Sequence, residues 1–594
     1  MSAQMQSALQ AFQSGQLEQA ERLLAELRDT QSGDALVWRL SGAVARARSQ
    51  TSQAEEFLRH AIALAPHEGE AWNTLGLLLD AQGRTEEAST AFQSAQARMT
   101  GQAAPSINLA RLLLRSGQGE AALAQLEAYK AEPAAQLVRA QAFQAIGQPD
   151  AAQSVYAALA ASGPANPRIT YGEALCLLDQ GEWEAALTRL DRLARQGVAE
   201  AHYPRFTALA RMGRTEEAFA ALKAVLSRDP SHIDALHGAA QLYWMTGEGD
   251  QIIPLYEMAL KVSGGQARVY QAFVDVLLQM GEVDTARQVV EAARTAHGAA
   301  AWCVERALHV EVEAGDAEQA WRLACEAERS HPDDPALFAN RCRAGLMNGA
   351  FEAIAPLVKR ARAQRPSDRF WVAMDAALAR AQGRQDDYAA LVDMDRFVRS
   401  FRLQPPAGYA DIGAFNAALA ACLQHLHAFS AAPLDQSLRG GVQTPSDLRF
   451  RKEPEIRAFL DMVKTAVGTY RDDLCAQPGH PLTGAMPDTP EVQGAWSVRL
   501  GPGGRHVNHV HPEGWISSVY YVSVPSQVRG SKTREGWLKF GEPPFAVTGL
   551  APHDYVEPVE GELTLFPSYL WHGTVPITSG ERLTIALDIK PAKG

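Results

Sequence analysis

Amphipathic segments of helical length fill the first two thirds of the chain, and a short turn follows each of them. Apolar side chains recur three and four positions apart within each segment, which predicts helices with one buried face. Nine of the eleven gaps between successive turns are 34 residues, and the other two are 30 and 32. This period predicts repeats of two helices that stack into a solenoid. The twelve turn positions are Gly15, Ser49, Gly83, Gly117, Gly147, Gly181, Gly213, Gly247, Gly281, Gly315, Gly349 and Gly383.

Small residues mark the places where the two helices of a repeat would meet. Ala stands five positions after most turns, and Gly or Ala often stands seven positions before them, so that the two helices can approach closely. Ile252, Ile354 and Tyr388 replace this Ala in three units, which we therefore expect to be loosely packed or distorted. The nine Ala positions are Ala20, Ala54, Ala88, Ala122, Ala152, Ala186, Ala218, Ala286 and Ala320.

The pattern changes after residue 400. Pro405 and Pro406 interrupt the period and predict a boundary. Two further helices are expected, with the loop-like segment SLRGGVQTPSDLRF between them, at 411–428 and 453–475. Beyond Pro478, short β-branched and aromatic runs separated by Gly and Pro predict antiparallel strands in a sandwich or barrel. The expected strands are 495–500, 516–524, 536–540, 561–566 and 582–589.

The length of 594 residues also requires more than one hydrophobic core. We predict a multidomain chain with an all-α superhelical solenoid at 1–398, a linker and helical lead-in at 399–478, and a β domain at 479–594.

Composition narrows the classes of function. Hydrophobic residues make up 46% and charged residues 21% of the chain, which is ordinary for a soluble protein. The net charge of −12 disfavours non-specific nucleic-acid binding, and no apolar stretch is long enough to predict a membrane span. The N-terminus has the pattern of an amphipathic helix rather than of a signal peptide. Six scattered cysteines without CxxC spacing are typical of reduced core thiols, so we expect a cytoplasmic protein without nucleic-acid or membrane partners.

The helical repeats resemble the tetratricopeptide repeat family over roughly residues 1–398. That family builds right-handed superhelices whose concave face holds peptides, so the resemblance implies a protein or peptide partner in the groove. A spacer or dimerisation role is the alternative. The repeat that resembles the family best carries Trp72, Leu75, Gly76, Leu79, Ala88, Phe92 and Ala95 at the family's positions.

Two histidine-containing motifs lie in the strand-like region. The segment RHVNHVHPEGWISSVYYV holds His506, His509, His511 and Glu513. On a strand, alternation would place His509, His511 and Glu513 on one face and His506 on the other. His506 is therefore expected at the surface or as a support for a ligand.

The second motif places His572 in LFPSYLWHGT, and Arg582 follows ten residues later at the start of the last predicted strand. Fe(II) in oxygenases needs three ligands on one face, and imidazoles suit it. Arg offers a planar fork for a carboxylate. A ligand pair, a distal His and an Arg in this order are the layout of a double-stranded β-helix oxygenase.

These motifs resemble those of bacterial Fe(II)/2-oxoglutarate oxygenases that carry tetratricopeptide repeats, over about residues 430–590. The resemblance implies a double-stranded β-helix (jelly-roll) domain. It implies Fe(II) bound by His509, His511 and His572, and 2-oxoglutarate bound by Arg582 together with Tyr521.

The metal frame has two possible forms. His509 and His511 form an HxH pair and an all-histidine site, which the resemblance favours. His511 and Glu513 form an HxE pair, which would complete the common set of two His and one carboxylate. His572 belongs to both forms. Zn²⁺ would suit the same ligands, and a cupin-like fold with a structural metal or a decayed site is the alternative.

The predicted function is an Fe(II)/2-oxoglutarate-dependent oxygenase that hydroxylates a protein or peptide docked by the repeats. A protein-interaction scaffold with an inactive or structural metal-binding barrel is the main alternative, and an enzyme acting on a small molecule is another. Trp515, Tyr569 and Trp571 are expected in the core or in the pocket wall, with substrate recognition as the alternative.

Overall fold

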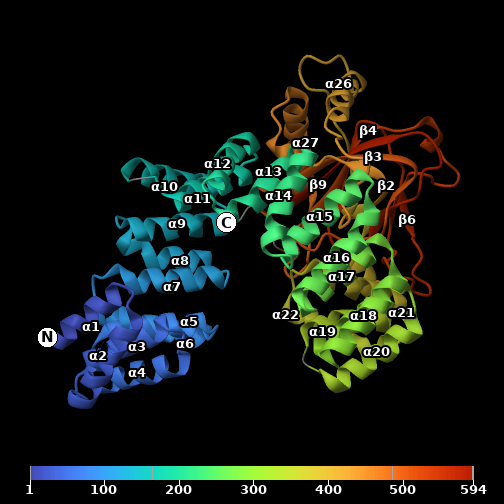
Figure 1. Ribbon diagram of the computed structural model, residues 1–594. Helices are drawn as coiled ribbons and strands as arrows, with labels where there is room; N and C mark the ends of the chain where they lie inside the picture. Colours follow the sequence, from blue (N-terminus) through green and yellow to red (C-terminus); the bar gives the residue numbers. More distant parts are fainter. Residues whose placement is uncertain (1, 164, 333, 485, 592–594) are drawn as a thin grey trace. The chain divides into compact units, whose positions relative to one another are not determined.

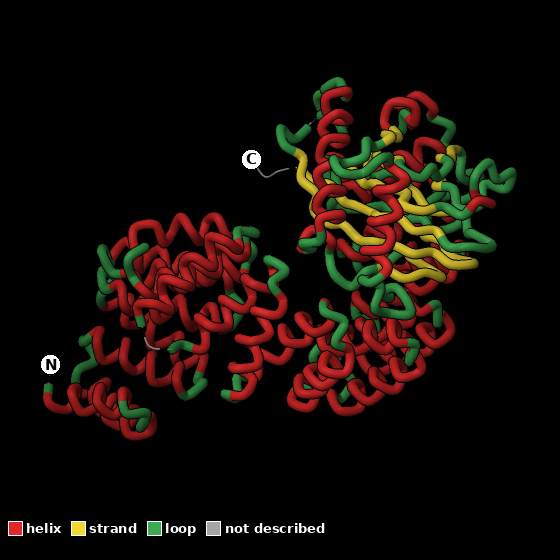
Figure 2. The backbone as a smooth tube through the Cα atoms, turned by 90° about the horizontal axis from the view of Figure 1, so that it is seen from above, coloured by secondary structure: helices red, strands yellow, loops and turns green. Residues whose placement is uncertain are grey.

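The computed structural model describes residues 2–163, 165–332, 334–484 and 486–591. The chain forms two compact units, Met1–Pro204 and Arg205–Gly594, called unit 1 and unit 2 below and described separately. Unit 1 consists of helices joined by turns, whereas unit 2 begins with helices and continues into two β-sheets (Figures 1 and 2). Within the described ranges, no helix combines the length and the apolar character needed to cross a membrane.

The helices of unit 1 pack as consecutive neighbours along the chain. They are α1 (Ala3–Gln13), α2 (Leu17–Thr30), α3 (Ala35–Ala47), α4 (Thr51–Leu64), α5 (Gly69–Ala81), α6 (Thr85–Arg98), α7 (Ala103–Arg115), α8 (Gly119–Leu126), α9 (Pro133–Ala145), α10 (Pro149–Ser162), α11 (Pro167–Asp179) and α12 (Trp183–Arg195).

Unit 2 begins with helices of the same kind. The first of them, α13, contains the division between the units, which falls after Pro204. They are α13 (His202–Arg211), α14 (Thr215–Arg228), α15 (Ile233–Thr246), α16 (Ile252–Ser263), α17 (Ala267–Met280), α18 (Val283–His297), α19 (Ala301–Ala314), α20 (Ala317–Ser330), α21 (Pro335–Met347), α22 (Phe351–Gln364), α23 (Arg369–Ala381), α24 (Gln385–Leu391), α25 (Met394–Phe397), α26 (Ile412–Gln424) and α27 (Pro454–Asp473).

All twelve predicted turn positions lie between two helices and have left-handed backbone conformations. The eleven glycines have φ between 70° and 84°, and Ser49 has φ 59°. An L-residue with a side chain pays roughly 1–2 kcal/mol for this conformation, which explains why Gly holds the other positions. The prediction of helix pairs that resemble tetratricopeptide repeats is confirmed.

Small residues do allow the helices of a repeat to approach. All nine of the predicted Ala positions are fully buried. A Cβ atom on Gly76 would lie 2.5 Å from Cε1 of Phe92, and one on Gly42 would lie 2.6 Å from Cγ of Leu58. Larger residues would force the two helices apart.

The three units without this Ala differ from one another. Ile354 is fully buried and faces Gly345, where a Cβ atom would lie 2.3 Å from Cγ2 of Ile354. Loose packing was therefore the wrong expectation there, because a glycine on the neighbouring helix makes room for the larger side chain. The unit at Ile252 is distorted by a 3₁₀ turn before α16, and the helix that contains Tyr388, α24, has only seven residues.

Two antiparallel sheets follow the repeats. The larger has the order β1-β7-β4-β9-β3-β2, and the smaller has the order β6-β5-β8. Helices α26 and α27 contact the larger sheet at β3, β4 and β7. The strands are β1 (Arg399–Arg402), β2 (Leu438–Gln443), β3 (Pro490–His506), β4 (Ile516–Ser523), β5 (Leu538–Phe540), β6 (Asp554–Val556), β7 (Glu562–Pro567), β8 (His572–Thr574) and β9 (Arg582–Pro591).

Several segments differ from the sequence prediction, among them the short strands β6 and β8, which lie outside the five expected strands. The segment 438–443, expected as a loop, forms β2 because it pairs with β3, and its glycines fit a register shift between Arg439 and Gly441. Arg399–Arg402 forms β1 on β7, although no strand was expected there. The histidine motif was expected on a strand, but β3 ends at His506, and the following residues form a loop with a single bridge from His509 to His572.

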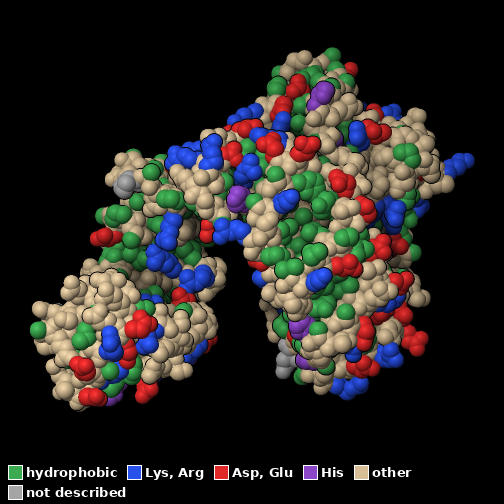
Figure 3. Space-filling model, viewed as in Figure 1, with side chains coloured by type: hydrophobic (Ala, Val, Ile, Leu, Met, Phe, Trp, Pro, Cys, Tyr) green, Lys and Arg blue, Asp and Glu red, His purple; other side chains and the backbone are tan. Residues whose placement is uncertain are grey.

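Repeat helices of unit 2 pack directly against the loops of the β region. Phe545, Leu550 and Trp571 share a hydrophobic core with residues of α19 to α23. Arg369 on α23 donates hydrogen bonds to the carbonyl oxygens of Gly514, at 2.9 Å, and Pro481, at 2.7 Å. The repeats thus hold the loop that carries His511. Acidic and basic side chains are interspersed on the face of unit 2 seen in Figure 3.

Candidate metal centre and its pocket

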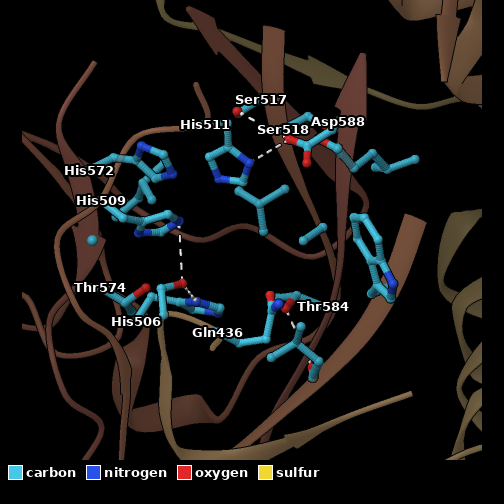
Figure 4. Close-up of a pocket in the computed structure, with 18 of the residues that line it drawn as sticks. Gln436, His506, His509, His511, Ser517, Ser518, His572, Thr574, Thr584 and Asp588 are labelled. Carbon is cyan, nitrogen blue, oxygen red and sulfur yellow. Dashed lines mark hydrogen bonds and ion pairs between the residues drawn. The ribbon is translucent and has the colours of Figure 1, made fainter. Parts of the chain in front are cut away.

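Three histidines meet at one end of a cavity of about 280 Å³ in unit 2. The candidate ligand atoms of His509, His511 and His572 all lie within 4.8 Å of one another. The ring centroids are 4.2 Å apart for His509 and His572, 4.9 Å for His509 and His511, and 5.3 Å for His511 and His572. Figure 4 shows the three rings facing the same space. The predicted HxH pair and the distal histidine are therefore brought together.

Backbone hydrogen bonds fix two of these histidines to each other. The amide N–H of His509 donates to the carbonyl of His572 at 2.9 Å, and the amide of His572 donates back at 3.1 Å. The amide of His511 donates to the carbonyl of Ser568 at 2.9 Å. The loop after β3 and the segment around β8 therefore set the spacing of the three rings.

Each ring also has an acceptor beside its Nδ1 atom. Nδ1 of His509 lies 2.8 Å from the carbonyl oxygen of Val507, and Nδ1 of His572 lies 2.8 Å from that of Leu570. Nδ1 of His511 lies 2.7 Å from Oδ1 of Asp588. Because these oxygens only accept, Nδ1 carries the proton and the lone pair of each neutral ring is at Nε2. That is the state in which an imidazole binds a metal.

Burial keeps two of the rings neutral. It is the main cause that lowers the pKa of His509 to about 3, with the neighbouring His511 as a further cause. Burial also lowers the pKa of His572 well below its ordinary value, and the neighbouring His509 and His511 lower it further. Burial alone would raise the pKa of Asp588, but the interactions with His511, His509 and Ser517 together lower it.

Glu513, the alternative ligand, lies outside the cluster. Its side chain is 84% exposed and forms an ion pair of 2.9 Å with Lys590. The loop ends the strand alternation that would have brought Glu513 to the same face as His511. The geometry therefore favours the HxH form over the HxE form.

His506 lines the same cavity and is not a surface residue. Its Nδ1 lies 3.0 Å from Oγ of Ser437, and the same hydroxyl lies 3.3 Å from Nε2 of His509. Ser437 thus links His506 to a candidate ligand. Sequence reasoning did not single out Ser437, because this residue directly precedes β2 in a segment expected to be a loop.

A buried arginine on β9, Arg582, lines the same cavity, and the parts of the cavity lined by the three histidines and by Arg582 are called the histidine end and the arginine end below. Arg582 is only 2% exposed, and its Nη1 donates to the carbonyl of Gly536 at 2.6 Å. Its guanidinium carbon lies 5.9 Å from the ring centre of Tyr521. Nε of Arg582 and the hydroxyl of Tyr521 are buried and have no hydrogen-bond partner among the described residues. Burial lowers the pKa of Arg582 and raises that of Tyr521 to about 12.

Alternate residues of β9 line the cavity. They are Arg582, Thr584, Ala586 and Asp588, and Leu587 lines it as well. Trp515 and Tyr569 are core residues whose polar atoms donate to the carbonyls of Leu482 and Leu391, at 2.9 Å each. Trp571 belongs to the core shared with the repeats. None of these three aromatic residues lines the cavity.

Comparison with known proteins matches both parts of the chain. Residues 494–588 match the family model described as "Putative 2OG-Fe(II) oxygenase". Tetratricopeptide repeat models match residues 45–106, 137–201 and 209–251.

Among curated proteins, the chain is similar to cellulose synthase operon protein C of Xanthomonas axonopodis pv. citri (strain 306), with 31% identity over 206 residues. The match covers 32% of this chain but only 13% of that protein.

Solved structures similar to this chain include Pseudomonas aeruginosa PilF, at 21% identity, a TM-score of 0.30 and coverage of 33% of this chain and 90% of that one. A tetratricopeptide repeat protein from Parabacteroides merdae ATCC 43184 matches at 15% identity and a TM-score of 0.33, covering 38% of this chain and 91% of that one. From the family matches, the chain combines tetratricopeptide repeats across its N-terminal region with a C-terminal domain of the 2OG-Fe(II) oxygenase family.

Proposed function

We propose that the chain is an Fe(II)- and 2-oxoglutarate-dependent oxygenase that hydroxylates a protein or peptide docked against its repeats. The observation that carries this proposal is a single cavity with three metal-competent imidazoles at one end and a buried, incompletely paired arginine at the other. A cation and a dicarboxylate would satisfy the two ends together.

The strand order supports a double-stranded β-helix. From β3 onward the chain passes repeatedly between the two sheets: β3, β4, β7 and β9 lie in the larger sheet, whereas β5, β6 and β8 lie in the smaller. The bridge from His509 to His572 places the loop after β3 beside β8, as a rudimentary fourth strand of the smaller sheet. Eight segments divided between two sheets in this way are the arrangement expected of a jelly roll.

The residues present fit the two groups that the family requires. His509, His511 and His572 would hold Fe(II) through Nε2, leaving coordination positions for other ligands. Arg582 would bind the distal carboxylate of 2-oxoglutarate, and the Tyr521 hydroxyl could donate to it. When bound, the iron would supply O2 activation coupled to decarboxylation of 2-oxoglutarate, which yields succinate, CO2 and a hydroxylated product.

The protein's own contribution is to position these groups and to limit access by water. The histidine rings are held by acceptors at Nδ1, so little reorganisation is needed on metal binding. Phe566 packs edge-on against His572, with 4.6 Å between the ring centres, and narrows this end of the cavity.

A second space leads from the histidines to the repeats. It measures about 750 Å³ and is lined by His509 and His511 on one side. Gln279 on α17, Glu313 on α19 and Arg343 on α21 line it as well. A substrate held by these repeat helices would therefore lie beside the metal centre, which supports a docked chain segment as the substrate.

The test is turnover of 2-oxoglutarate to succinate by the full chain with added Fe(II), with His572→Ala as the inactive variant. We expect succinate formation that depends on iron and is stimulated by the true substrate. The variant Arg343→Glu should reduce this stimulation but not the basal turnover of 2-oxoglutarate. Absence of 2-oxoglutarate turnover, with the metal bound, would favour the scaffold function instead.

A further inference from the structure

The candidate metal centre contains no carboxylate among its three ligands, yet a carboxylate lies directly behind one of them. Oδ1 of Asp588 is 2.7 Å from Nδ1 of His511, and Figure 4 shows the two side chains facing each other. The matching positions behind His509 and His572 are occupied by neutral backbone carbonyls. The three histidines are therefore not equivalent, because only His511 hydrogen bonds to a charged acceptor.

The fold holds Asp588 in this position. It is opposite Ser517 in the register of β9 and β4, and the hydroxyl of Ser517 lies 3.4 Å from Oδ1 of Asp588. The same hydroxyl donates to Oγ of Ser568 at 3.1 Å, and the carbonyl of Ser568 accepts from the amide of His511. Asp588 and His511 are thus both held in place through Ser517 and Ser568, whose side chains hydrogen bond to each other.

No other cationic side chain competes for this carboxylate. Of the described residues, His511 is the only one with a basic side-chain nitrogen within ion-pair distance of the carboxylate of Asp588. Lys590, two positions further along β9, pairs with Glu513 instead. The charge of Asp588 is therefore directed at His511.

We propose that Asp588 is a positioning residue that supplies, through His511, the negative charge that a carboxylate ligand supplies in the common set of two His and one carboxylate. A carboxylate that accepts the Nδ1 proton fixes the ring orientation and makes Nε2 a stronger electron donor. The charge thus acts one hydrogen bond away from the metal, while all three ligands remain imidazoles. This inference rests on the proposed function for the identity of the metal, but not on its activity.

Glu513 provides a matched control. It is also a carboxylate and lies two residues from His511, but its side chain points into solvent and pairs with Lys590. Removal of its charge changes the net charge of the protein by the same amount as removal of the charge of Asp588. A general electrostatic effect would therefore act in both variants, and a specific one only in Asp588→Asn.

The experiment is titration of the full chain with Co(II) in the absence of 2-oxoglutarate, following both affinity and the visible d–d absorption of the bound ion. We expect Asp588→Asn to weaken Co(II) by about 10- to 100-fold and to shift the absorption. Asp588→Glu, which keeps the charge on a longer side chain, should recover part of the affinity, and Glu513→Gln should match the wild type.

Two results would overturn the proposal. Wild-type affinity and absorption in Asp588→Asn would show that the charge does not reach the metal. Loss of Co(II) binding as complete as in His572→Ala, with no recovery in Asp588→Glu, would make Asp588 a direct ligand. Wild-type Co(II) binding without any turnover of 2-oxoglutarate would contradict the proposed function alone, whereas absence of Co(II) binding by the wild type would contradict both.

Discussion

The two ends of the cavity differ in how far the protein itself satisfies their polar groups. At the histidine end, every Nδ1 atom of the three rings has an acceptor within 2.8 Å. At the arginine end, Nε of Arg582 and the hydroxyl of Tyr521 have no partner among the described residues. The histidine end is therefore already organised by the protein, whereas the arginine end leaves two polar atoms that a ligand would satisfy.

This difference follows from what each end would bind. A metal needs neutral rings with free lone pairs, and fixing the tautomer in advance costs little once the acceptors are backbone carbonyls. A buried guanidinium without a counter-ion is costly, and a ligand carboxylate would relieve that cost. Variants at the two ends should accordingly separate metal affinity from affinity for the cosubstrate.

The largest effect is expected from His572→Ala. This ring contributes one of the three imidazoles whose ligand atoms lie within 4.8 Å of one another, and His506, the fourth histidine of the cavity, is not part of that group. We expect the affinity for Fe(II), measured by anaerobic calorimetry, to fall by at least about 100-fold. Iron affinity close to that of the wild type would contradict the histidine set.

Arg582→Ala should affect the opposite end. We expect the affinity for 2-oxoglutarate to fall by about tenfold or more, since a charged hydrogen bond contributes roughly 1.5–3 kcal/mol, while Fe(II) affinity stays nearly unchanged. Arg582→Lys should recover only part of the loss, because Lys lacks the planar fork. Equilibrium binding of 2-oxoglutarate with the metal present is the measurement, and a parallel loss of both ligands would show that the two ends are not separable.

A fall in pH should lower the free energy of unfolding through the histidine end and not through the arginine end. The folded chain holds the pKa of His509 at about 3, mainly through burial, against an ordinary value of 6.5. Between these values the unfolded chain binds a proton that the folded chain does not, so the free energy of unfolding decreases as the pH falls from about 6.5 towards about 3.

Urea unfolding of the metal-free protein across that pH range measures this dependence. His509→Gln should make it shallower, whereas Arg582→Ala should not, because a guanidinium stays protonated throughout. An unchanged pH dependence in His509→Gln would show that this ring is not kept neutral by the fold.

The smallest effect is expected from Glu513→Gln. The variant loses one exposed ion pair with Lys590, and such pairs contribute about 0–1 kcal/mol. Fe(II) affinity should remain within about twofold of the wild type. A large decrease in iron affinity would revive the HxE form of the site.

The repeats could be predicted in detail because each one depends on local rules. The turn at Gly83, the fully buried Ala88 and the close approach at Gly76 recur at a nearly fixed spacing, so that a single pattern describes most of the units. The expectation of loose packing at Ile354 was wrong, because Gly345, which makes room for this larger side chain, lies on the neighbouring helix rather than at the expected position.

The β region could be predicted only where its strands alternate strongly. Strands β1 and β2 were missed because their pairing partners, β7 and β3, are distant in sequence. The histidine loop was mistaken for a strand, which kept Glu513 as a possible ligand. Asp588 lies within the predicted last strand, but only the fold shows that it meets His511. The domain boundaries at 398 and 478 remain predictions.

The most direct test of the central claim is an anaerobic titration of the wild-type chain with Fe(II) and then with 2-oxoglutarate, monitored by visible absorption. Chelation of iron by the keto acid gives a charge-transfer band that neither Fe(II) nor 2-oxoglutarate gives alone. We predict that the band appears in the wild type, needs more 2-oxoglutarate in Arg582→Ala and is absent in His572→Ala. Absence of the band in the wild type at saturating Fe(II) and 2-oxoglutarate would contradict the account.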